Sequence, residues 1–197
     1  DFLNRATGYR GLAAEAGVFV NEPVIVHYRA GAVEVTDVNE RIVELPFVFR
    51  GLAGVPAGSN VVDIGSSEST VSLSLASLGH QVTSVDPRGY AFAHPNITNL
   101  SDISEAPDGR FDVAVLLSTI EHVGVAHYGQ DADPDADLAL MRVLATKMAP
   151  GGRLLLTTPY GDGRDGGFQR IYDASRLAQL VEPFEIVELE IAQRSGA

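Results

Sequence analysis

Two acidic residues lie at or near the ends of short apolar runs that have the length of buried strands. If these strands are parallel neighbours in one sheet, the two acidic side chains lie at the same edge of it. Asp63 precedes the small-residue turn Gly65, Ser66, Ser67, and Asp86 ends the next run. A turn of small residues lets a ligand approach the backbone, and a carboxylate after the second strand can accept hydrogen bonds from both hydroxyls of a ribose. The pattern therefore predicts a site for an adenosine-containing cofactor.

The type of turn discriminates among such cofactors. The dinucleotide fingerprint needs further glycines, whereas this chain has only Gly65, followed by Ser67 and Ser69. An NAD-linked enzyme is therefore disfavoured, although it stays as an alternative.

Composition narrows the classes further. The 197 residues include 14 Lys and Arg, 26 Asp and Glu and no Cys, with a net charge of −12. The absence of Cys excludes disulfides, thiolate zinc sites and a Cys nucleophile, and the acidic balance disfavours nucleic acid as a partner. Apolar runs are too short to cross a membrane, so we expect no membrane partner and, by default, a cytoplasmic location.

Hydrophobic periodicity predicts the elements that position these residues. An N-terminal part, residues 1–56, would hold a hairpin and a cap helix over residues 40–53, and residues 57–197 would form the cofactor-binding core within one globular unit. Predicted strands cover residues 61–64, 81–85, 111–117, 153–157 and 184–191, and predicted helices cover residues 70–78, 137–148 and 174–181. This alternation predicts an α/β fold with a doubly wound, mostly parallel, Rossmann-like sheet and helices on both faces.

Five segments in this order resemble the class I S-adenosylmethionine-dependent methyltransferases from about Asn39 onward. They are residues 61–65, Asp86, the pair Asp102 and Ile103, residues 111–123 with Glu-His-Val, and the Pro-Gly-Gly turn within residues 148–156. The resemblance implies S-adenosylmethionine as cofactor and a helix carrying Glu44 above it. The implied cofactor-binding residues are Asp63, Gly65, Ser66, Ser67, Asp86, Pro87, Asp102, Ile103, Leu117 and Ser118.

Methyl transfer to a hydroxyl also needs a group that removes a proton, and His122 after the fourth strand is the first candidate. Glu121, His122 and His127 form the candidate catalytic set. Some methyltransferases that this chain resembles use a Glu-His pair with a divalent metal, but their additional Glu is replaced here by Ser118. We therefore predict no metal site, with a divalent metal kept as the less favoured alternative.

Two further segments invite an interpretation. Acidic residues alternate from Asp131 to Asp137, which we interpret as a solvated loop whose last Asp caps a helix, because the pattern lacks the Gly and the final acid of an EF-hand. Tyr160, Asp162, Arg164 and residues 170–172 would line the acceptor pocket, with residues 161–167 as a mobile flap.

The sequence therefore predicts O-methylation of a small hydroxylated acceptor, a sugar or a natural-product intermediate, as the resemblance to enzymes of glycan and natural-product pathways implies. Two other classes stay open: an enzyme using NAD or another adenosine cofactor on the same fold, and a domain that binds the cofactor without catalysis as the partner of another chain. The sequence leaves self-association open.

Overall fold

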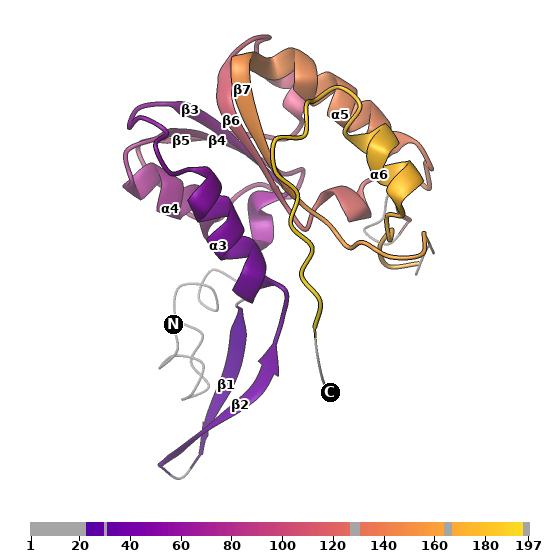
Figure 1. Ribbon diagram of the computed structural model, residues 1–197. Coiled ribbons are helices and arrows are strands. Elements are labelled where there is room, and N and C mark those ends of the chain that lie inside the picture. Colours follow the sequence, from indigo (N-terminus) through magenta and orange to yellow (C-terminus); the bar gives the residue numbers. More distant parts are fainter. Residues whose placement is uncertain (1–22, 30, 127–130, 164–166, 195–197) are drawn as a thin grey trace.

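The computed structural model describes residues 23–29, 31–126, 131–163 and 167–194. Its centre is a five-stranded sheet in the order β5-β4-β3-β6-β7, with every neighbouring pair parallel (Figure 1). The strands are β3 (Asn60–Ile64), β4 (Gln81–Val85), β5 (Ile97–Leu100), β6 (Phe111–Leu117) and β7 (Met148–Thr157). The predicted doubly wound, Rossmann-like sheet is confirmed.

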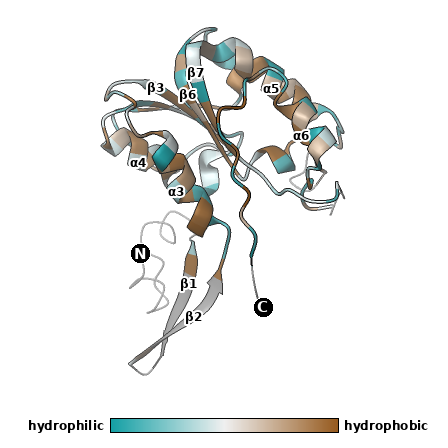
Figure 2. Ribbon diagram, in the orientation of Figure 1, coloured by the Kyte–Doolittle hydropathy of each residue, from teal (hydrophilic) through white to brown (hydrophobic). Residues whose placement is uncertain are grey.

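Two apolar layers flank this sheet. One face packs against α3 (Arg41–Gly51) and α4 (Val71–Ser77), and the other against α5 (Ala136–Lys147) and α6 (Ala174–Leu180). Figure 2 shows hydrophobic residues concentrated along the strands and on parts of the covering helices. The central strands β3 and β6 are buried on both faces, which explains their nearly continuous apolar sequence.

Shorter elements complete the chain. The predicted hairpin is present as β1 (Val24–Arg29) paired antiparallel with β2 (Ala32–Val38), a two-stranded sheet separate from the main one. Three single-turn 3-10 helices follow strands of the main sheet: η1 (Ser66–Glu68), η2 (Ile103–Glu105) and η3 (Ile120–His122). Each places side chains at the carboxyl edge of the sheet.

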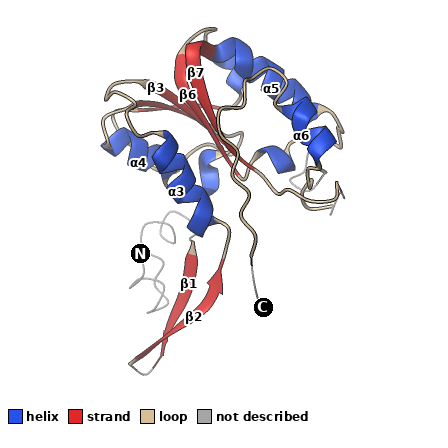
Figure 3. Cartoon of the chain, viewed as in Figure 1, coloured by secondary structure: helices blue, strands red, loops and turns tan. Residues whose placement is uncertain are grey.

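The predicted strand over residues 184–191 is wrong. These residues carry the expected alternation, but they form no ladder hydrogen bonds, and Figure 3 draws them as loop. Val187 is 93% exposed and Ile191 67% exposed. Alternating side chains favour a strand only where a neighbouring strand supplies hydrogen-bond partners, and none of the described strands lies in register beside this segment.

Within the residues that the structure describes, no helix combines the length and the apolar character needed to span a lipid bilayer.

Candidate functional site

An open cavity of about 2200 Å³ includes the carboxyl ends of the parallel strands and extends along β7, α6 and residues 184–192. Ligands of doubly wound sheets bind at the carboxyl edge, and a pocket for one small molecule typically has a volume of about 300 to 1,000 Å³. The cavity is therefore large enough for a cofactor and a second molecule. Of the predicted site residues, its lining includes Gly65, Asp86, Pro87, Asp102, Ile103, Leu117, Ser118, Glu121 and His122.

The turn after β3 has a backbone conformation that requires glycine at position 65. Gly65 has a φ of 78°, and its N–H donates to Val85 O at 2.8 Å. A Cβ at this position would lie 2.3 Å from Thr119 Oγ1, which itself donates to Ile64 O at 3.0 Å. The turn is therefore pressed against the start of η3, and only glycine meets both demands.

Asp86 lies on the next strand end, 4% exposed and already oriented by its neighbours. Its carboxylate accepts from Ser67 N at 3.2 Å and from Arg88 N at 2.9 Å, and the Arg88 guanidinium lies 2.8 Å from Glu68 Oε1. Sequence reasoning missed Arg88, although its position two residues after the acid was a signal. The carboxylate is fixed in place and still lines the cavity.

The other predicted residues of this turn do not line the cavity. Asp63 accepts from Ser72 Oγ at 2.7 Å, and Ser66 Oγ lies 2.6 Å from Ser84 Oγ. Burial raises the pKa of Asp63 to about 6, despite the hydrogen bond from Ser72. These hydrogen bonds, together with the one from Ser67 N–H to Asp86, hold the turn in place. Direct contact of Asp63, Ser66 and Ser67 with a cofactor stays a prediction.

The strand end of β5 presents an apolar wall. Ile103 is 3% exposed and lines the cavity. The Asp102 side chain caps η2 by accepting from Ser104 N at 2.7 Å, and Glu105 reciprocates at the Asp102 N–H. Hydrogen bonds from Ser104 hold the pKa of Asp102 below its usual range, so this side chain serves the local backbone.

A buried polar cluster follows β6. Ser118, with a φ of 45°, donates from its hydroxyl to Glu44 Oε1 at 2.6 Å, and the other oxygen of Glu44 accepts from Arg41 at 2.5 Å. Arg41 and Glu44 come from α3 and are 7% and 8% exposed, respectively, at the cavity wall. Sequence reasoning placed Glu44 near the cofactor but missed Arg41, because the ion pair depends on how α3 lies over the sheet.

Glu121 is the most deeply buried acid of the cavity wall, at 1% exposure. Within the described residues its Oε2 is buried without a hydrogen-bond partner. Burial raises the pKa of Glu121 to about 8, and the negative charge of Glu44 adds to the shift. The carboxyl group is therefore largely protonated at neutral pH.

His122 lies at the same edge in a more open position. Its Nδ1 is 3.1 Å from Phe168 O, and its ring packs edge to face on Phe168 at 4.9 Å between centroids. The third predicted catalytic residue, His127, lies outside the described residues, as does Arg164 of the predicted acceptor pocket. Across the described ranges no three His, Cys, Asp or Glu side chains gather as a metal site would require.

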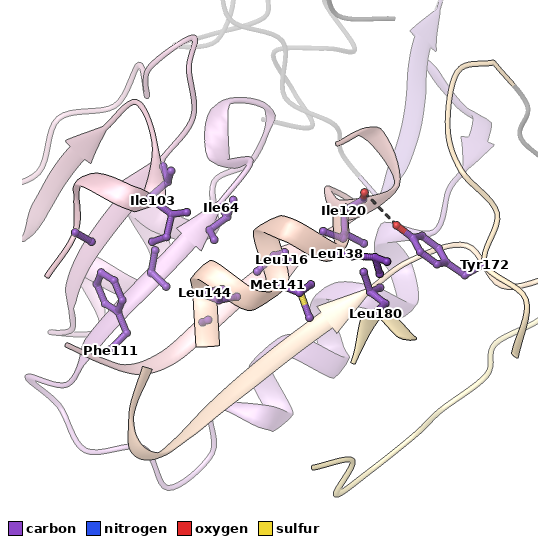
Figure 4. Close-up of a cluster of buried hydrophobic side chains, with 14 residues drawn as sticks. Ile64, Ile103, Phe111, Leu116, Ile120, Leu138, Met141, Leu144, Tyr172 and Leu180 are labelled. Atoms are coloured by element: carbon purple, nitrogen blue, oxygen red, sulfur yellow. Dashed lines mark hydrogen bonds between the residues drawn. The ribbon is translucent and has the colours of Figure 1, made fainter. Parts of the chain in front are cut away.

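The segment after β7 contributes to the wall only in part. Tyr160, Phe168 and Thr158 line the cavity, and Thr158 Oγ1 is buried without a hydrogen-bond partner among the described residues. The prediction that Tyr172 lines the acceptor pocket is wrong, since its side chain is fully buried and its hydroxyl lies 3.2 Å from Ile120 O (Figure 4). Arg170 is anchored by its N–H, which donates to Glu121 O at 2.9 Å.

Asp137 also corrects an expectation. Asp131, Asp133 and Asp135 are exposed, as expected of a solvated loop, but Asp137 does not cap the helix: it is fully buried within the first turn of α5, and Asp135 holds the N-cap position. The Asp137 carboxylate forms ion pairs with Arg170 at 3.2 Å and Arg176 at 2.5 Å and lies 2.9 Å from the Tyr172 hydroxyl. This cluster ties α5, α6 and residues 167–173 together behind η3.

Part of this chain is similar in sequence to curated O-methyltransferases. Ubiquinone biosynthesis O-methyltransferase of Xanthomonas axonopodis pv. citri (strain 306) is 30% identical in an alignment 116 positions long, and this alignment covers 52% of this chain and 44% of that protein. The chain thus spans less than half the length of the curated relatives it matches.

Two solved structures share the fold. One is the Burkholderia thailandensis 1,6-didemethyltoxoflavin-N1-methyltransferase, bound to 1,6-didemethyltoxoflavin and S-adenosylhomocysteine, with a TM-score of 0.54 and 19% identity over 73% of this chain and 67% of that one. The other is the [4+2]-cyclase SpnF, with a TM-score of 0.52 and 17% identity over 71% of this chain and 55% of that one. The class I methyltransferase fold is therefore confirmed, while the cyclase shows that the fold also serves another reaction.

One family model matches the C-terminal half of the sequence. Residues 94–194, just over half of the chain, match the model described as "Caenorhabditis protein of unknown function, DUF268". This stretch includes β5, β6, the polar residues of η3 and the Asp137 cluster. The chain accordingly belongs to the DUF268 family, and it has the class I methyltransferase fold.

Proposed function

We propose that this protein binds S-adenosylmethionine in the cavity and transfers the methyl group to a small hydroxylated acceptor. The observation that carries the proposal is the meeting of the Gly65 turn, the Asp86 carboxylate and the η3 residues around one cavity. The O-methyltransferase that is 30% identical to half of this chain supports it. A sugar or a natural-product intermediate is the proposed acceptor class.

Each part of the cavity has a role in this proposal. Asp86 accepts hydrogen bonds from the ribose, Ile103 packs on the adenine, and the Gly65 turn admits the methionine part close to the backbone. The bound cofactor supplies an electrophilic methyl group. His122 is the candidate that takes the proton from the acceptor hydroxyl, and Tyr160, Phe168 and Thr158 line the cavity that would hold the acceptor.

The test is calorimetric titration with S-adenosylhomocysteine and, separately, with NAD, since neither titration requires the acceptor. We expect binding of S-adenosylhomocysteine and no response to NAD. Binding of NAD alone would instead support the alternative adenosine-cofactor enzyme. Binding of neither would overturn the proposal.

A variant pair tests the geometry of the binding site. Asp86→Ala removes an acceptor for ribose hydroxyls and should weaken S-adenosylhomocysteine binding by about 1.5 to 3 kcal/mol. Glu68→Gln is the matched control, because it removes the other ion pair of Arg88 but leaves the strand-end carboxylate in place. Equal affinities of Asp86→Ala and Glu68→Gln would contradict the assignment of Asp86.

Catalysis is a separate step from binding. A domain that binds the cofactor without catalysis would show the same titration but no methylation in a screen of sugars and phenols. A cytoplasmic location stays a prediction, and self-association stays open.

A further inference from the structure

Glu121 is a buried acid that the proposed reaction does not yet use. It sits at the carboxyl end of β6, 1% exposed, with Oε2 unpartnered in the part of the chain that the structure describes. Thr119, two residues earlier, touches the Gly65 turn and bonds to Ile64 O. Glu121 lines the same cavity as the Gly65 turn, which the proposed function assigns to the methionine part of the cofactor.

The charges around Glu121 come mainly from one neighbouring helix. Glu40, Arg41 and Glu44 of the α3 region act on it, the two acids favouring its neutral form and Arg41 its charged form. Arg41 is already engaged by Glu44. His122 follows in the chain on η3.

The remaining charged neighbour is on the segment behind η3. Arg170 donates its backbone N–H to Glu121 O but directs its guanidinium to Asp137 and to Val123 O. No cation in the described structure is therefore paired with the Glu121 carboxyl group, and burial leaves it in the neutral form.

We propose that Glu121 makes the pocket sensitive to the charge of its ligand: the carboxyl group keeps its proton in the empty pocket and with S-adenosylhomocysteine, and releases it to solvent when the sulfonium of S-adenosylmethionine binds. The inference rests on the proposed function. The physical reason is that a nearby cation strongly stabilises the charged form of a carboxyl group that is shielded from water, as Glu121 is, whereas a neutral thioether does not. The two ligands otherwise share the adenosine and the amino acid part.

The pH dependence of affinity follows from the sign of this proton exchange. Binding that releases a proton becomes tighter as pH rises, up to the pKa of the free carboxyl group, which is about 8. S-adenosylmethionine affinity should therefore increase about eightfold between pH 6.5 and 7.5 and level off above pH 8.5. Asp63, with its pKa of about 6, titrates below most of this window.

The experiment measures protons directly. Calorimetric titrations at pH 7.0 in phosphate and in Tris, which differ in ionisation enthalpy, give the number of protons released by each ligand. We expect about one more proton released with S-adenosylmethionine than with S-adenosylhomocysteine. In Glu121→Gln this difference should fall by about one proton, and comparing the variant with wild type removes any ionisation of the ligands themselves.

Glu188→Gln is the matched control, because Glu188 is an exposed acid on the wall of the same cavity. It should keep the proton difference. If Glu121→Gln does not fold, Glu44→Gln provides a second measurement: loss of the neighbouring negative charge should move the pH dependence of S-adenosylmethionine affinity to lower pH.

The outcomes separate the two proposals. Equal proton release by both ligands, or a difference that persists in Glu121→Gln, would overturn this inference while leaving the proposed cofactor in place. Failure of both ligands to bind would overturn the proposed function and this inference together.

Discussion

At the scale of single residues, two adjacent side chains of the site, Glu121 and His122, differ in how far they are buried. Glu121 is buried with a raised pKa, whereas His122 is only half-buried and contacts Phe168. The sequence predicted both as chemical residues and ranked His122 first, but it could not show that Glu121 is the buried one, because burial and neighbouring charge depend on α3 and on the segment after β7. Arg41 and Arg88 were missed for the same reason.

His122→Ala tests the proposed proton acceptor. Once an acceptor substrate is found, turnover should fall roughly 10²- to 10⁴-fold, because the acceptor hydroxyl loses its base. The dissociation constant of S-adenosylhomocysteine should stay unchanged, since Asp86 and the Gly65 turn are untouched. His94→Ala, which removes a histidine away from the cavity wall, should keep full turnover. Undiminished activity of His122→Ala would make it a packing residue.

Glu121 also predicts a pH dependence of stability. Its folded-state pKa, about 8, lies above the ordinary value of 4.5, so its contribution to the free energy of unfolding is full below pH 4.5 and is lost as pH rises through 8. Glu121→Gln cannot ionise. Relative to wild type, the variant should therefore gain on the order of a few kcal/mol between pH 5 and pH 9, measurable by urea unfolding. A constant difference across this range would contradict the raised pKa.

At the scale of elements, the turn after β3 is the most constrained feature. Gly65→Ala adds a Cβ in a left-handed conformation and directly against Thr119. Gly58→Ala is a matched control, since Gly58 has a φ of 86° but open space around its Cβ position. We expect the control to cost about 1 kcal/mol from backbone strain and Gly65→Ala to cost about 1 to 3 kcal/mol more from overpacking. Similar unfolding midpoints for the two variants would show that Thr119 moves aside freely.

The Asp137 cluster is the second element-scale prediction. Asp137→Asn leaves Arg170 and Arg176 without their shared buried carboxylate, and should destabilise the fold by about 3 to 5 kcal/mol. Asp135→Asn is the control, because Asp135 also pairs with Arg176 but is 70% exposed at its side chain and should cost less than about 1 kcal/mol. Thermal unfolding of the two variants decides, and equal losses would show that the buried pairing contributes little.

Elements were predictable where local pattern determines structure. The hairpin, the buried strands β3, β4 and β6 and the helices α4, α5 and α6 all lie within a few residues of the predicted bounds, because apolar periodicity is a local signal. The strand expected over residues 184–191 failed because pairing is not local. Tyr172 and Asp137 failed similarly: a polar side chain in a loop-like sequence was buried by partners from distant elements.

At the scale of the whole molecule, the cavity is assembled from segments far apart in the sequence. Glu44, Gly65, Asp86, Glu121 and Phe168 meet only after α3, β3, β4, β6 and the segment after β7 have taken their places. The order β5-β4-β3-β6-β7 makes this necessary, since β3 pairs with β6 although α4, β4 and β5 lie between them in the sequence. Sequence could predict which strand ends share an edge, but not which side chains on that edge would become buried.

This parallel order also has a consequence for folding kinetics. Every strand pair of the main sheet joins segments that are distant in the sequence, so the chain must close long loops before the cavity forms. We therefore expect the rate-limiting step of folding to occur before the binding site is complete. A ligand of the cavity then has little to bind in the transition state. In stopped-flow experiments, S-adenosylhomocysteine should therefore leave the refolding rate almost unchanged and slow unfolding. A bound ligand would then stabilise the folded protein by lowering its unfolding rate, without accelerating its folding.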